Sequence, residues 1–212
     1  MKSKTLGLIA VAFLAVGSMS AARADIVVIT GVNNQGTDNV LLNPATNVTT
    51  VTGVVGANNL LVEFTSDSGS GLLSANPSGQ ATITGGTGNN PFTDFGLALV
   101  NEFFERAVFN INAATNGSVL IHVEGVNING GFFEDDFTVD ANGENFFTVT
   151  AINGQFISSI DLTAINGATF EDVRQVRLGG GDIATSVPEP GTLALLGLGL
   201  MGLGLSRRRK VD

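Results

Sequence analysis

Five acidic side chains lie within 11 residues of one another, and their oxygens could hold a metal ion: Glu134, Asp135, Asp136, Asp140 and Glu144. Clusters that offer only oxygen suit Ca²⁺, which takes about six to eight such ligands. The segment 140–144 lacks the spacing of an EF-hand loop and its closing bidentate glutamate. Strand alternation would also send Asp135 and Asp136 to opposite faces. Calcium binding by these five residues is therefore an open alternative.

Carboxylate pairs can also hydrolyse glycosides, and a histidine can serve a Ser-His-Asp triad. The chain has no Trp or Tyr to supply the aromatic platforms common at sugar-cleaving sites. His122 is its only histidine, no G-x-S-x-G elbow occurs, and His122 lies beside Glu124 in the middle of an expected strand. These observations favour a protein that is not an enzyme and uses no cofactor, with a secreted glycan-active enzyme as a lesser alternative.

The elements that must position these side chains are expected to be β-strands. Runs rich in β-branched residues alternate between apolar and polar positions. In one of them Val119, Ile121 and Val123 should face inward, while His122 and Glu124 face the other way. Strands are predicted at 26–30, 48–55, 60–65, 80–84, 92–100, 107–113, 118–126, 133–139, 145–152, 156–163 and 173–178. The segment 97–106 could instead form a helical turn, although it has no convincing cap.

Asn-Gly pairs recur at 116–117, 129–130, 142–143, 153–154 and 166–167. Asn-Gly suits type I′ hairpin turns, in which both central residues have positive φ. The spacing predicts consecutive antiparallel strands of about eight residues each. Residues 66–91 are expected to form long loops around one short strand. The fold class is therefore all-β, an antiparallel β-sandwich or jelly-roll-like domain. Its core must be filled largely by phenylalanine, and the pairs 103–104, 132–133 and 146–147 should place one ring on each face.

Charge and cysteine content exclude several classes of protein. The chain has no cysteine, so disulfides and thiolate metal sites are ruled out. Residues 25–186 hold 3 basic side chains (Arg106, Arg174 and Arg177) against 17 acidic ones, a net charge of −14. Such a surface repels nucleic acid and keeps the protein soluble, and it could also attract cations.

The N-terminal residues 1–24 predict a secretory signal peptide. Lys2 and Lys4 supply its charged region, and the apolar run 6–16 follows them. The sequence Ala22-Arg23-Ala24 fits the cleavage rule of signal peptidase, so the mature chain is expected to begin at Asp25.

The C-terminal residues 187–210 combine three features. Gly197-Leu-Gly199-Leu-Met-Gly202 matches the dinucleotide fingerprint G-x-G-x-x-G, but too few residues follow for the required helix and acidic residue. The 14 residues 192–205 carry no charge, and as a helix they would extend about 21 Å, short of a hydrocarbon core of about 30 Å. A thinned bilayer and snorkelling of the basic residues 207–210 would still allow them to insert as a transmembrane helix.

The motif Val187-Pro188-Glu189-Pro190-Gly191-Thr192, the Leu/Gly-rich run and the cluster of Arg207, Arg208 and Arg209 together resemble the PEP-CTERM sorting signal. The resemblance covers about the last 24 residues. It implies a partner, the membrane protease exosortase, which removes the tail, and a Gram-negative host that makes exopolysaccharide. It implies nothing about the fold or activity of the preceding residues.

The sequence as a whole predicts a signal peptide with a signal helix (1–24), a β-sandwich domain (25–186) and a sorting signal (187–210) with a transmembrane helix (192–205). The expected function is that of an exported structural or adhesive protein. It would pass through the inner membrane with signal peptidase and exosortase as partners and reach the cell surface or extracellular matrix, in contact with exopolysaccharide. The open alternatives are a calcium- or carbohydrate-binding module and a glycan-active enzyme.

Overall fold

The computed structural model describes residues 26–67, 71–77, 81–86, 90–126, 132–141 and 143–180. Within these ranges the chain forms strands and no helix, which confirms the all-β prediction. No helix in these ranges is long and apolar enough to cross a bilayer. The predicted signal helix, the predicted signal-peptidase site at Ala24 and Asp25, the sorting signal 187–210 and the predicted transmembrane helix 192–205 lie outside the described residues.

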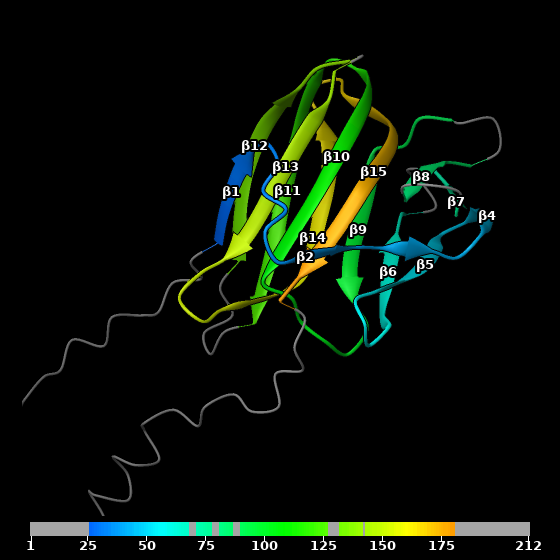
Figure 1. Ribbon diagram of the computed structural model, residues 1–212. Helices are drawn as coiled ribbons and strands as arrows, with labels where there is room; N and C mark the ends of the chain where they lie inside the picture. The colour runs from blue at the N-terminus through cyan, green and yellow to red at the C-terminus, as the bar shows by residue number, and fades with distance from the viewer. Residues whose placement is uncertain are drawn as a thin grey trace, which may run out of the picture.

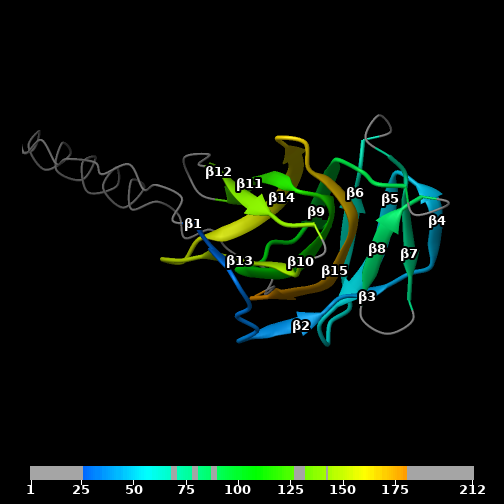
Figure 2. The ribbon, with the colours of Figure 1, turned by 90° about the horizontal axis from the view of Figure 1, so that it is seen from above.

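Two antiparallel sheets face each other as a sandwich (Figure 1). Sheet A runs in the order β1 (Ile26–Thr30), β13 (Asn145–Ala151), β10 (Arg106–Thr115), β15 (Thr169–Gly179), β8 (Thr82–Gly85), β7 (Leu73–Asn76) and β4 (Ala45–Val48), and β2 (Thr37–Asn39) also pairs with β15. Sheet B runs in the order β12 (Phe132–Val139), β11 (Gly117–Val126), β14 (Phe156–Ile165), β9 (Asp94–Leu99), β6 (Leu60–Thr65), β5 (Thr50–Val55) and β3 (Leu41–Leu42). Figure 2 shows the two layers from above.

Phenylalanine and β-branched residues fill the space between the sheets. Phe64, Phe95 and Phe170 are almost fully buried there, beside valines and isoleucines from both sheets. The Phe pairs behave as predicted: Phe147 is buried while Phe146 is only half-buried, and Phe133 packs against the core while Phe132 is exposed. The predicted inward orientation of Val119, Ile121 and Val123 on β11 is also confirmed, since all three side chains are fully buried.

Three predictions about local structure are wrong. The segment 97–106 is not helical, because residues up to Leu99 belong to β9, Phe104 bridges Ile157, and β10 starts at Arg106. Leu97 and Leu99 are buried while Ala98 between them is half-buried, the period of two that suits a strand. The segment 66–91 contains a hairpin of two strands, β7 and β8, where a single strand was expected. The short strands β2 and β3 were not predicted, and the predicted strand 48–55 is divided between the end of β4 at Val48 in sheet A and β5, Thr50–Val55, in sheet B.

Two of the three described Asn-Gly turns have the predicted backbone conformation, but the strands that the turns connect do not pair with each other. Asn153 and Gly154 have φ of 58° and 74°, and Asn166 and Gly167 have φ of 54° and 87°, the signs that a type I′ turn needs. Asn116 and Gly117 do not have positive φ. All three turns join strands of different sheets, so none of them closes the expected hairpin. A turn fixes only local backbone, while burial of two inner faces decides which strands pair. Residues 129, 130 and 142 lie outside the described ranges.

Candidate functional site

The outer face of sheet B gathers the polar side chains of interest. Because side chains alternate along β11, His122 and Glu124 point away from the core. In the strand register, His122 lies opposite Glu134 on β12 and opposite Asp161 on β14. A row of titratable side chains, Glu134–His122–Asp161, therefore crosses three adjacent strands.

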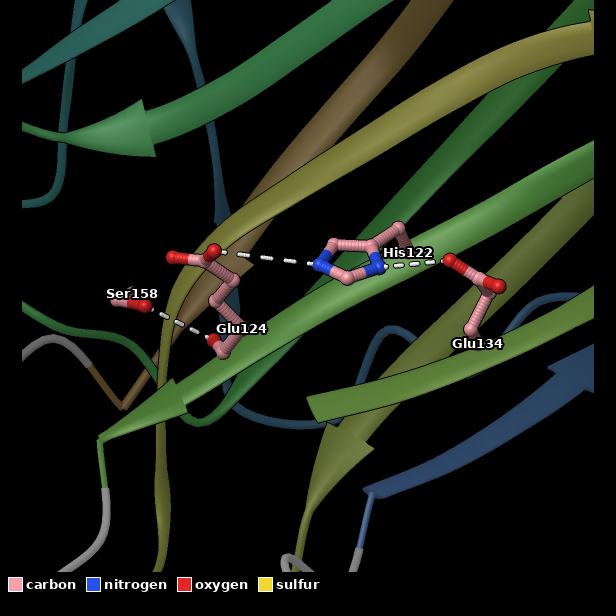
Figure 3. A network of polar contacts seen from close by, with 4 residues as sticks. All are labelled: His122, Glu124, Glu134 and Ser158. Atoms are coloured by element: carbon pink, nitrogen blue, oxygen red, sulfur yellow. Dashed lines mark hydrogen bonds and ion pairs between the residues drawn. The ribbon is translucent and has the colours of Figure 1, made fainter. Parts of the chain in front are cut away.

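The His122 ring lies between two carboxylates (Figure 3). Its Nδ1 is 3.0 Å from Glu134 Oε2, and its Nε2 is 3.9 Å from Glu124 Oε1. This contact is a hydrogen bond in the tautomer whose Nδ1 carries a proton, since a carboxylate oxygen accepts. Ser158 Oγ donates to the backbone oxygen of Glu124 at 3.0 Å and ties β14 to β11 at this point. Both ring nitrogens thus face carboxylates, an arrangement unlike that of a Ser-His-Asp triad.

Phe132 stacks on His122 and is exposed to solvent. The two ring centroids are 5.1 Å apart with an interplanar angle of 25°. Phe132 lies opposite Glu124 in the register, one diagonal step from His122, which is the spacing at which long side chains meet on a sheet. The Phe132 residue is 62% exposed. The ring thus presents an apolar face to solvent beside hydrogen-bonding groups, an arrangement to which a ligand could bind.

Asp161 occupies a restricted position on the same face. Gly96 lies directly opposite it on β9. A Cβ at Gly96 would come within 2.5 Å of Thr65 Oγ1 and 2.9 Å of Asp161 Oδ1, so a glycine here makes room for the carboxyl group. Burial raises the pKa of Asp161, His122 acts in the opposite direction, and the charges of Asp94 and Glu124 raise it further.

We expect Asp161→Asn to stabilise the protein at neutral pH. Since the folded-state pKa of Asp161 is raised above its ordinary value of 3.8, the folded state binds a proton more tightly than the unfolded state does. Stability should therefore fall as pH rises through the window between 3.8 and the raised pKa, and stay low above it. An amide has no charge to desolvate, so thermal melts at several pH values should show a higher melting temperature at pH 7 and a weaker decline.

Glu144→Gln removes the same charge from an exposed loop and serves as the matched control. Equal pH profiles for Asp161→Asn and the unaltered protein would contradict the assignment.

The five predicted metal candidates do not converge. Glu134 and Asp136 lie on the outer face of sheet B, while Asp135 lies opposite the buried Ile121. Asp140 is held in a loop, where its backbone N donates to Asn145 Oδ1 at 3.0 Å, and Glu144 is exposed. In the described part of the chain, no three His, Cys, Asp or Glu side chains are grouped so that they could hold a metal ion.

The three arginines of the described residues lie on strands of sheet A, the sheet opposite the one that carries His122. Arg177 on β15 donates to Thr37 Oγ1 at 3.1 Å and to Thr37 O at 2.8 Å. Arg106 on β10 donates to Gln35 O at 2.6 Å. Arg106 and Arg177 thus hold the segment around β2, and Arg174 also lies on β15. Among the described residues, His122 is the only basic side chain on the outer face of sheet B.

Sequence reasoning found part of this site. It placed His122 and Glu124 outward and selected Glu134, but it did not select Asp161 or connect Phe132 with His122. The sequence pattern of residues 156–163, in which Asp161 stands between the apolar Ile160 and Leu162, did indicate that Asp161 faces away from the core. No local pattern reveals that β14 pairs with β11.

Comparison with known proteins identifies the C-terminal region. Residues 186–210 match the PEP-CTERM protein-sorting motif, which confirms the resemblance inferred from Pro188, Glu189, Pro190 and the arginine cluster 207–209. The motif marks the chain as an exported protein that is sorted through exosortase at the membrane. Comparison with curated proteins found no match.

Two solved structures resemble the chain distantly. A mutant of the family 29 carbohydrate binding module CBM29-2, studied for its mechanism of ligand recognition, is 14% identical, with 72% of this chain and 98% of that chain covered and a TM-score of 0.37. A family 29 carbohydrate binding module from Piromyces equi is 13% identical, with 78% and 97% covered and a TM-score of 0.28. Similarity at this level carries no conclusion about function.

Proposed function

We propose that the chain is a non-enzymatic protein of the cell surface or extracellular matrix that contacts exopolysaccharide through the outer face of sheet B. It needs no metal or cofactor for this role. The sorting motif supports delivery to the outside, and the outer face of sheet B supplies the contact surface. In this proposal signal peptidase cuts before Asp25, the segment 192–205 holds the chain in the inner membrane of a Gram-negative cell, and exosortase then removes the tail.

The observation that carries the proposal is the exposed Phe132 ring stacked on His122 among carboxylates. A sugar ring has faces of C–H groups and a rim of hydroxyls. An aromatic ring packs against the C–H face and excludes water from it. Glu124, Glu134 and Asp161 can accept hydrogen bonds from the hydroxyls. The combination of one apolar platform and several acceptors on neighbouring strands of the same face matches the chemistry of a glycan.

The charge of the face favours uncharged glycans over acidic ones. Asp161 and Asp94 lie on neighbouring strands of the same face as Glu134, and the described residues place no Lys or Arg there. A chain of uronic acids or sulfated sugars would meet like charge at every step. Neutral polysaccharides should therefore bind more tightly than acidic polysaccharides of equal length.

The placement of the chain ends suits a tethered intermediate. Ile26 lies opposite Ala151, and both Thr150 and Gly179 lie opposite Arg106. The start of β1 and the end of β15 therefore lie at the same end of the sandwich (Figure 1). Phe132 and Glu124 lie toward this same end, because Val126 of β11 pairs with Phe156 at the start of β14. Removal of the tail would therefore free this end of sheet B from the membrane.

We expect Phe132→Ala to weaken binding to a neutral polysaccharide at least about tenfold. Burying a large apolar side chain contributes about 1.5–3 kcal/mol, and about 1.4 kcal/mol is a factor of ten in affinity. Affinity electrophoresis or calorimetry of the exported protein measures the change.

Leu41→Ala is the matched control, because Leu41 is 64% exposed at the opposite edge of sheet B and should leave affinity unchanged. Equal affinity of the Phe132→Ala variant and the unaltered protein would exclude this face. Release of reducing sugar ends from the bound polysaccharide would show instead that the protein is an enzyme.

A further inference from the structure

Strand β1 forms an open edge of sheet A. It pairs with β13 along its length, and no described residue pairs with its other side. Its sequence, Ile-Val-Val-Ile-Thr, has high β propensity and contains neither charge nor proline. An edge of this kind is a template for pairing with another strand.

Strand β1 and its partner β13 carry no charged side chain, although Asp25 directly precedes β1 in the sequence and Arg106 donates from Nε to Thr150, which lies opposite Val27. Residues 26–37 and 145–160, which include β1 and β13, contain no Asp, Glu, Lys or Arg. Residues 25–186 as a whole carry 3 basic and 17 acidic side chains. Two copies of such an acidic molecule repel each other over most of their surface. They can approach with least repulsion at the neutral β1 edge.

The edge strand of sheet B is protected in a way that β1 is not. Strand β12 carries Glu134, Asp135 and Asp136. Asp135 lies opposite the buried Ile121, so an acidic residue occupies the inward register of the strand, and it is exposed at the edge. Inward-directed charge is a device by which proteins prevent edge-to-edge association. The absence of this device from β1 singles out that edge for association.

The backbone of β1 presents suitable groups to a second strand. Gly31 N donates to Phe146 O at 2.8 Å, so this pair is hydrogen-bonded in the ladder with β13. Antiparallel ladders alternate, so Val27 and Ile29 also direct their backbone groups at β13. The N–H and C=O groups of Ile26, Val28 and Thr30 therefore point to the free edge.

We propose that β1 pairs with β1 of a second copy of this chain, antiparallel about a two-fold axis at Val28. In this register Val28 meets Val28 of the second copy as a hydrogen-bonded pair, and Ile26 meets Thr30 of the second copy. Val27 lies opposite Ile29 of the second copy on the outer face, where these side chains are 42% and 46% exposed in one copy. Pairing covers these apolar side chains and satisfies the free backbone groups. The occupant proposed is a second copy, because this register is open to an identical strand and the uncharged β1 edge is where two copies of this acidic molecule repel each other least.

Sedimentation velocity of the exported protein over a range of concentrations tests the pairing without any glycan. The unaltered protein should show a dimer whose fraction rises with concentration. Val27→Glu/Ile29→Glu places acids opposite each other across the axis and should raise the dissociation constant at least tenfold. Leu41→Glu/Leu61→Glu adds the same charge at apolar positions on sheet B that are 64% and 40% exposed, and should keep the dimer. Circular dichroism checks that both variants are folded.

Oxidative crosslinking gives a second readout that needs no change of charge. The chain has no cysteine, so a single new thiol reports on its own position. A hydrogen-bonded pair has Cα atoms about 5.5 Å apart, which a disulfide can bridge. Val28→Cys should form a covalent dimer, and Leu41→Cys on β3 should not. A monomer at all concentrations, or crosslinking of Val28→Cys no greater than that of Leu41→Cys, would overturn the proposal and leave the glycan-binding face unaffected.

Discussion

Replacement of Pro188, Glu189 and Pro190 by alanine is expected to leave the C-terminal tail attached to the protein. These residues lie within the sorting motif at 186–210. A protease that recognises the motif should lose its substrate, because two prolines and a carboxylate disappear together from the recognised sequence. The uncharged run 192–205 and the arginines after it then stay on the chain and retain it in the membrane fraction.

Intact-mass spectrometry of the membrane and external fractions measures the outcome. The unaltered protein should appear outside the cell without its tail, and the variant should remain full length in the membrane, with a loss of external protein of tenfold or more. Alanine at Asp182 and Ile183, upstream of the motif, is the control and should be processed normally. Normal removal of the tail from the variant would show that the motif is not the recognised element.

The class of the fold was predictable because side-chain alternation is a local property. Val119, Ile121 and Val123 alternate with polar residues over one short run, and their burial follows from the period of two. The Phe pairs follow the same rule, since adjacent residues on a strand must face opposite sides. Nothing beyond a few neighbours in the sequence is needed for either inference.

The pairing of strands was not predictable from the same signals. The turn at 153–154 has the predicted positive φ values and still joins β13 of sheet A to β14 of sheet B. The choice between a hairpin and a crossing depends on which faces must be buried together across the whole chain. Strand β7 escaped prediction because only four residues, 73–76, lie between stretches rich in glycine and serine.

The candidate site shows the same division. His122 and Glu134 were recognisable as polar positions on exposed strand faces. Their contact requires that β11 and β12 pair in one particular register, and the position of Asp161 requires that β14 adds to the other side of β11. The five acids at 134–144 are near one another in sequence, yet alternation and a loop separate their side chains. Proximity in sequence therefore suggested a metal site whose side chains the fold keeps apart, and it gave no indication of the side chains that the fold brings to His122.

Phe95→Ala is expected to destabilise the domain by about 3–5 kcal/mol, the usual cost of removing a buried aromatic ring. Phe95 is 1% exposed, and its ring lies 5.7 Å from Phe64 and 6.3 Å from Phe92. Phe92 in turn makes an edge contact with Phe170 of sheet A at 5.7 Å, so the cluster joins the two sheets. Truncation leaves a cavity at this junction that close-packed neighbours fill only in part.

Urea denaturation of the exported protein measures this loss, and Phe132→Ala provides a control with the same change of side chain. Phe132 is 62% exposed and should cost less than about 0.5 kcal/mol. Since domains are stable by only about 5–15 kcal/mol, Phe95→Ala should move the denaturation midpoint strongly while Phe132→Ala should barely move it. Similar midpoints for the two variants would contradict the division between a core ring, Phe95, and a surface ring, Phe132. That division is physically necessary if Phe132 is to bind a glycan, because only a ring that the fold does not need can be left in water for a ligand.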